Sequence, residues 1–165
     1  MITKEHYRYG AFILACILVV IGLYGCGNSE EKVAAKTGPA LEKYVDDYKK
    51  SMGIKGELEE TDDKEYSLAI NEDVFLFVQV DDKENVTSSY VAGTLEAAGT
   101  KELETAQKAL IHSYDADLAE KDIYDVMNKL GIYDTTDKKT NTESIDGARL
   151  TYAVDSSVIL KAEYK

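Results

Sequence analysis

The chain has 165 residues and two thiols, Cys16 and Cys26, and both lie near its start. Residues 11–23 carry no charge, two basic residues precede them, and Gly25 stands directly before Cys26. A basic start, a short apolar middle and a small residue at the end are typical of an export signal. These residues therefore predict a targeting segment rather than an element of the fold.

The four residues Leu23-Tyr24-Gly25-Cys26 resemble the lipobox of bacterial lipoproteins. Cys26 matches its obligatory cysteine, and Tyr24 stands where a smaller or β-branched residue is usual. The resemblance implies transfer of a diacylglyceryl group to the Cys26 thiol, cleavage after Gly25, and acylation, for example with palmitate, of the new amino terminus. Two or more acyl chains hold a protein stably on a bilayer. The implied location is the cell membrane, with the domain on the extracytoplasmic side.

Two alternatives remain open for this segment: an uncleaved membrane anchor and conventional secretion. Residues 10–25 are 16 uncharged residues, whereas a spanning helix needs about 20, so the stretch suits a signal better than a span. All three interpretations place the C-terminal domain on the outer side of the cytoplasmic membrane. Residues 27–37 are small and polar and predict a tether, which reaches under about 40 Å when extended.

Composition predicts one acidic domain. The whole chain has 19 basic and 31 acidic side chains; cleavage after Gly25 would remove two basic and one acidic, which leaves a net charge of −13 on 140 residues. That length suits a single domain with a core. We therefore expect a signal at 1–25, a lipidated cysteine and tether at 26–37, and one domain at 38–165. The negative charge excludes a nucleic-acid partner, which needs a basic surface.

Hydrophobic spacing predicts an α+β fold. Helices are expected over residues 39–52, 101–114 and about 117–130, with Gly53 and Gly131 at two of their ends. Strands are expected at 55–61, 66–70, 74–80, 86–94, 149–154 and 158–164, with a polar loop at 134–141. The resulting architecture is an antiparallel sheet of about five or six strands with two to three helices packed on one face. The repeated order of helix, glycine, isoleucine and hairpin also fits a duplicated helix-hairpin unit.

His112 is the histidine that a cleaved chain would keep, and Ser113 and Asp115 follow it closely. Neighbours this close on a helix point in different directions, and no G-x-S-x-G motif is present. We therefore interpret His112 as a solvent-facing residue at a helix end, and we expect no catalytic residue.

An acidic cluster follows this histidine, and acidic oxygens are the ligands that calcium prefers. An EF-hand loop that starts at Asp115 needs glycine at its sixth position and glutamate at its twelfth, where the chain has Glu120 and Val126. Helix capping by Asp117 and Glu120 explains the cluster better. The sequence therefore predicts neither a metal site nor a cofactor.

Tyrosine is the remaining candidate for recognition, because it offers contact area and a hydroxyl at low entropic cost. Most tyrosines of the domain fall on the inward stripes of the predicted elements. Tyr90, Tyr124 and Tyr133 do not, and we expect them to form an exposed, partner-binding aromatic patch.

These observations favour a non-enzymatic lipoprotein that is held on the membrane by its lipid and binds a protein partner at the cell surface. It would act as an inhibitor, an exclusion factor or an accessory envelope factor. A small-ligand or peptide-binding lipoprotein is the alternative, and a hydrolase is the third class.

Overall fold

The computed structural model describes residues 36–134 and 137–165. Gly25, Cys26 and most of the expected tether lie outside these described residues. The described part contains three helices and seven strands: α2 (Leu41–Met52), β1 (Leu58–Asp62), β2 (Glu65–Ala69), β3 (Val74–Val80), β4 (Val86–Thr94), α3 (Lys101–Tyr114), α4 (Glu120–Leu130), β5 (Lys139–Ser144), β6 (Ala148–Val154) and β7 (Ser157–Tyr164). The predicted α+β fold is confirmed, with a sheet one strand larger than expected.

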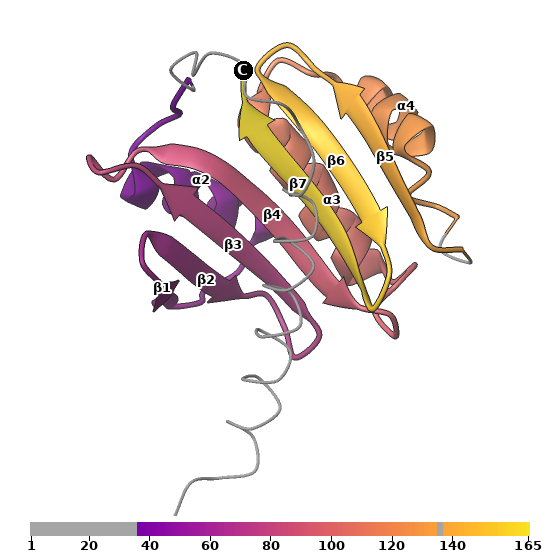
Figure 1. Ribbon diagram of the computed structural model, residues 1–165, viewed down its shortest axis with the longest axis horizontal. Helices are drawn as coiled ribbons and strands as arrows, with labels where there is room; N and C mark the ends of the chain where they lie inside the picture. The colour runs from indigo at the N-terminus through magenta and orange to yellow at the C-terminus, as the bar shows by residue number, and fades with distance from the viewer. Residues whose placement is uncertain (1–35, 135–136) are drawn as a thin grey trace, which may run out of the picture.

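All seven strands form one antiparallel sheet in the order β1-β2-β3-β4-β7-β6-β5. The strands β1 to β4 form one meander and β5 to β7 a second, and the last strand of each meander pairs with the other at the centre. The helices lie behind the sheet in Figure 1 and cover one of its faces. We call this the inner face and the opposite side the outer face. This arrangement is compatible with an internal duplication, which stays a prediction.

Glycine ends two of the helices, as the sequence predicts. Gly53 after α2 and Gly131 after α4 adopt left-handed backbone angles, with φ of 66° and 70°. Their N–H groups donate to carbonyls of the last helical turn, which satisfies oxygens that the helix itself leaves free. A side chain at either position would strain the backbone, because only glycine adopts this conformation without a steric cost.

The helix starts differ from one another. The side chain of Thr100 accepts the N–H of Leu103 and caps α3. In contrast, α4 begins after Ala119 with no side-chain cap, so the expected capping pair of Asp117 and Glu120 is wrong. Asp117 lies two residues before the capping position, and a capping box requires its first member at that position.

Strand β5 is the element that sequence reasoning missed, because residues 134–141 were expected to be a loop. Its residues Lys139–Ser144 alternate between half-buried and exposed but include no apolar side chain. An edge strand pairs with a single neighbouring strand. Here that neighbour is β6, which pairs with β5 through backbone hydrogen bonds. Polar side chains on an edge strand also discourage pairing with other molecules. The alternation of apolar and polar side chains that identifies most strands was therefore absent from residues 139–144.

The main core lies between the helices and the inner face, and buried tyrosine hydroxyls connect its layers. Tyr44 Oη of α2 lies 2.7 Å from Ser89 Oγ of β4, which lies 3.0 Å from Tyr114 Oη of α3. Tyr114 Oη donates to the carbonyl oxygen of Ala162 on β7 at 3.1 Å. One hydrogen-bonded chain therefore joins two helices to the two central strands. Burial of these hydroxyls without partners would be costly.

We expect Tyr114→Phe to lower the free energy of unfolding by about 1–2 kcal/mol, because it leaves Ser89 and the Ala162 carbonyl without a shared partner. Urea unfolding followed by circular dichroism measures this change. Tyr66→Phe is the matched control, since it removes a hydroxyl from a half-buried tyrosine of β2 outside this network. Equal losses in the two variants would contradict a structural role for the network.

Alkaline pH should also destabilise the fold. Burial raises the pKa of Tyr152 and of Tyr164 to about 12, and it raises the pKa of Tyr44, Tyr48 and Tyr114 above the ordinary tyrosine range as well. Below pH 10 these groups are neutral in both states, so their contribution is fully present. Above pH 10 the unfolded chain loses protons first, so stability falls as pH rises toward the folded pKa values. The melting temperature should therefore drop steadily above about pH 10. Ionisation of all nine tyrosines of residues 38–165 at ordinary pKa values while the protein stays folded would contradict this prediction.

Candidate functional site

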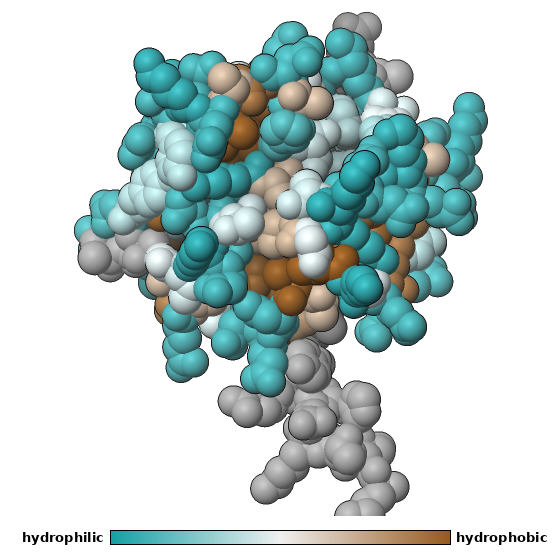
Figure 2. Space-filling view, turned by 180° about the vertical axis from the view of Figure 1, so that it is seen from behind, coloured by the Kyte–Doolittle hydropathy of each residue, from teal (hydrophilic) through white to brown (hydrophobic). Residues whose placement is uncertain are grey.

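Two exposed tyrosines lie close together where α3 and α4 meet. Tyr124 projects from α4 and is 37 % exposed, and Tyr133, in the turn after that helix, is 49 % exposed. Together with Leu95 they are the large hydrophobic side chains exposed in residues 36–134 and 137–165. Figure 2 views the molecule from the helical side and shows that hydrophilic residues cover most of this face. Tyr124 and Tyr133 are therefore the two tyrosines among the exposed large hydrophobic side chains of the described residues.

Two residues of α3 hold the tyrosine pair in place. Glu104 and Lys108 are four residues apart and so lie on one side of the helix, with Lys108 Nζ 2.6 Å from Glu104 Oε1. Lys108 Nζ also donates to the Tyr124 hydroxyl and lies 3.8 Å from the centre of its ring. The Tyr133 hydroxyl donates to Glu104 Oε1 at 3.3 Å. We call these four residues the Tyr124–Tyr133 surface.

The surroundings of Lys108 and Tyr133 favour the protonated form of both side chains. Burial opposes the charge on Lys108, but Glu104 and the Tyr124 hydroxyl outweigh it and raise the pKa of Lys108. Partial burial, followed by the charge of Glu104, raises the pKa of Tyr133. At neutral pH the lysine is therefore charged and compensated by Glu104, while Tyr133 keeps its proton. The surface presents two rings without an uncompensated positive charge between them.

A small recess adjoins Tyr133. It has a volume of about 200 Å³, and its walls include Gly99, Leu103, Gln107 and Tyr152. The Gln107 side chain is buried, and its Nε2 has no hydrogen-bond partner among the residues that the structure describes. Residues that dominate the energy of an interface often fill such pockets beside aromatic side chains. The recess is therefore large enough for one small side chain.

Tyr90 does not belong to this surface, and the expectation that it is exposed is wrong. Its side chain is fully buried on the outer face of the sheet, where its ring stacks on Phe77 with centroids 4.7 Å apart. β4 is a central strand, so Tyr90 has neighbours on both sides of it on the same face, Phe77 on β3 and Lys161 on β7. The uncharged run of residues 86–94 was the available signal for such a strand.

His112 is exposed and lies in the wall of a groove of about 580 Å³ between α2 and the end of α3. The hydroxyl of Ser113 donates to the carbonyl oxygen of Ala109 at 2.7 Å, within its own helix. In the described part of the chain, no group of three or more His, Cys, Asp or Glu side chains is arranged to hold a metal ion.

Sequence reasoning found Tyr124 and Tyr133 but missed Glu104 and Lys108, which position them. A Glu–Lys pair at a spacing of four residues on a predicted helix was the available signal. No helix within the described ranges is long and apolar enough to cross a membrane. Gly25 and Cys26 lie outside those ranges. Comparisons with protein-family models, curated proteins and solved structures find no match to this chain.

Proposed function

We propose that this protein is a lipoprotein, anchored through Cys26 on the outer side of the cell membrane, that binds a protein partner through the Tyr124–Tyr133 surface without catalysing a reaction. The inhibitor, exclusion and accessory envelope roles all belong to this class. The sequence of residues 1–26 supports the anchor. The observation that carries the binding role is the pair of exposed tyrosines held in place by Glu104 and Lys108.

The physical argument for binding rests on pre-organisation. An exposed side chain that must be immobilised by a partner costs about 0.5–1.5 kcal/mol of entropy. Here the hydroxyl groups of Tyr124 and Tyr133 are hydrogen-bonded to side chains of α3 in the free protein. Part of the loss of side-chain entropy therefore occurs on folding rather than on binding. Large aromatic area on a pre-organised scaffold is typical of the residues that dominate binding energy.

The charge of the domain suggests the chemistry of the partner. Tyr124 lies among acidic residues of α4, and the mature chain would carry a net charge of −13. A partner with an apolar or aromatic centre and a basic rim would match the tyrosines and the surrounding charge. Complementary charge at the rim mainly increases the rate of association and excludes acidic competitors.

Lipid attachment is tested by metabolic labelling with an alkyne analogue of palmitate. We expect the unaltered protein to become labelled and Cys26→Ser to remain unlabelled, because the thiol is the acceptor of the diacylglyceryl group. Mass spectrometry of the amino-terminal peptide should place the new terminus at Cys26. An unlabelled chain that retains residues 1–25 would contradict the lipid anchor and indicate a membrane-spanning segment instead.

Partner binding is tested by cross-linking on intact cells. The double variant Tyr124→Ala/Tyr133→Ala should lower the yield of the cross-linked complex, with a loss of affinity of about thirtyfold if the pair contributes about 2 kcal/mol. Asp46→Ala is the control, because it removes an exposed side chain from α2. Tyr124→Phe/Tyr133→Phe separates the rings from their hydroxyls. A complex of unchanged yield in the double alanine variant would contradict the assignment of this surface.

A further inference from the structure

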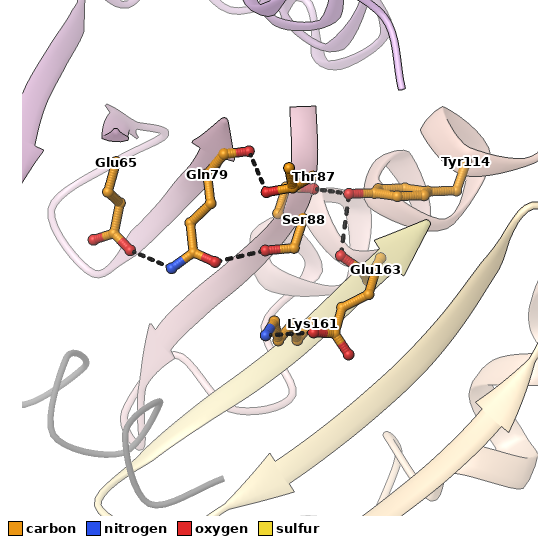
Figure 3. Close-up of polar contacts among 9 residues, drawn as sticks. Glu65, Gln79, Thr87, Ser88, Tyr114, Lys161 and Glu163 are labelled. Carbon is orange, nitrogen blue, oxygen red and sulfur yellow. Dashed lines mark hydrogen bonds and ion pairs between the residues drawn. The ribbon is translucent and has the colours of Figure 1, made fainter. Parts of the chain in front are cut away.

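The chain has two glutamines, and their side-chain amides are bonded differently. Gln79 of β3 has partners at both ends: its Nε2 donates to Glu65 Oε2 at 3.1 Å, and its Oε1 accepts from Ser88 Oγ at 2.7 Å (Figure 3). Gln107 of α3 is 1 % exposed, and its Nε2 has no hydrogen-bond partner among the residues that the structure describes. Buried polar groups of folded proteins are nearly always hydrogen-bonded. The unpaired N–H groups of Gln107 therefore require a physical explanation.

Gln107 lines the recess beside Tyr133, whose volume is about 200 Å³. Ser157 Oγ is the other buried side-chain atom without a partner in the described part of the chain, and Ser157 does not line this recess. Glu104 lies three residues before Gln107, so both side chains project from one side of α3, and both line the recess. The recess therefore combines an N–H donor without a partner and a carboxylate, which is an acceptor.

The walls of the recess restrict the charge of a group that binds there. Leu103, Ile132 and Val158 contribute apolar surface, and burial of an isolated charge in such surroundings is costly. A carboxylate would also be repelled by Glu104. An ammonium group would pair with Glu104 but has no acceptor for the N–H groups of Gln107. The recess therefore favours an uncharged group with a donor and an acceptor.

A carboxamide meets these requirements better than a hydroxyl group. It carries its acceptor oxygen and its two N–H donors on separate atoms, so it can bond to Gln107 and to Glu104 at the same time. Glu104 Oε1 already accepts from the Tyr133 hydroxyl at 3.3 Å and pairs with Lys108. Because a carboxylate has about four acceptor positions, Glu104 can accept a further N–H group. One carboxamide would therefore satisfy both polar groups of the recess.

We propose that the recess binds one carboxamide side chain, an asparagine or a glutamine, of the partner protein. Its oxygen accepts from Gln107 Nε2 and its nitrogen donates to Glu104, while other parts of the partner contact the rings of Tyr124 and Tyr133. This assignment rests on the proposed function, because it identifies the residue that the partner inserts beside Tyr133. A site that hydrogen-bonds a polar group strongly rejects analogues without that group. The recess therefore gives the Tyr124–Tyr133 surface its selectivity.

Propionamide is the probe, because it carries the same carboxamide as a glutamine side chain. The full chain, labelled with ¹⁵N and held in detergent micelles, has two glutamines, so Gln79 serves as an internal control for Gln107 in nuclear magnetic resonance spectra. We expect propionamide to shift the side-chain N–H resonances of Gln107 with a Kd of roughly 10 mM and to leave those of Gln79 unchanged. Propionate and propanol should bind at least about tenfold more weakly.

The same titration can overturn the proposal. Gln107 resonances that stay unshifted up to about 100 mM propionamide, or that shift equally with propionate or propanol, would do so. Glu104→Gln tests the role of charge, because it should strengthen the binding of propionate by roughly tenfold. Unchanged binding of propionate in Glu104→Gln would contradict the assigned role of the carboxylate.

Gln107→Leu separates a binding role from a structural one. It replaces the amide by an apolar group of similar size, so the urea midpoint of unfolding should stay the same or rise. The affinity for propionamide, read from the backbone resonance of Ile132, should fall about tenfold. Gln79→Leu is the matched control, and its midpoint should fall because Glu65 and Ser88 lose their shared partner. A midpoint that falls as far in Gln107→Leu as in Gln79→Leu would overturn the proposal.

Neither test contains a partner protein, and neither depends on lipid attachment. A negative result would therefore leave the lipid anchor and the binding role of Tyr124 and Tyr133 unaffected. Propionamide binding together with unchanged cross-linking of Tyr124→Ala/Tyr133→Ala would overturn the assignment of the carboxamide to a protein partner.

Discussion

The pairing of β4 with β7 is the constraint on which the rest of the structure depends. It joins two meanders that are separate in sequence, and it runs over seven residue pairs from Ser88–Glu163 to Thr94–Ser157. Side chains of both strands are buried on both faces. Every other strand is positioned relative to this pair, because each meander extends outward from it one hydrogen-bonded neighbour at a time. Loss of this pairing would separate the domain into two meanders, each with an exposed edge strand.

The two faces of this central pair have different physical roles. On the inner face Ser89 joins Tyr44 and Tyr114 in a hydrogen-bonded chain, which fixes the positions of α2 and α3 over the sheet. On the outer face, one residue further along, Tyr90 stacks on Phe77 in a separate apolar cluster that also contains Phe75, Ala92 and Ile159. Successive residues of a strand point to opposite sides. Two adjacent residues of β4 therefore take part in two separate clusters.

Tyrosine is used in three ways in this protein, and the environment of the hydroxyl distinguishes them. The hydroxyls of the inner core bond to backbone or serine oxygens and stabilise contacts between layers. The Tyr90 ring is buried against the ring of Phe77, and its hydroxyl lies 3.4 Å from a Glu65 oxygen on the same face of the sheet. Tyr124 and Tyr133 expose their rings, while Lys108 and Glu104 restrain their hydroxyls. The charged pair on α3 therefore restrains the hydroxyls of both exposed tyrosines.

Local patterns in the sequence determined the α+β class, most helix and strand positions, and the helix ends at Gly53 and Gly131. These features depend on spacing and backbone preference, which act over a few residues. The tertiary structure decided what depends on neighbours distant in the chain. Strand β5 exists because β6 supplies its backbone partners, and Tyr90 lies between residues of β3 and β7 that are distant from it in sequence. Glu104 and Lys108 meet Tyr133 and Tyr124 only once α3 and α4 pack together. Periodicity reports which face of an element is apolar. Which neighbour covers that face is decided by packing, and here all three described helices pack on the inner face of the sheet.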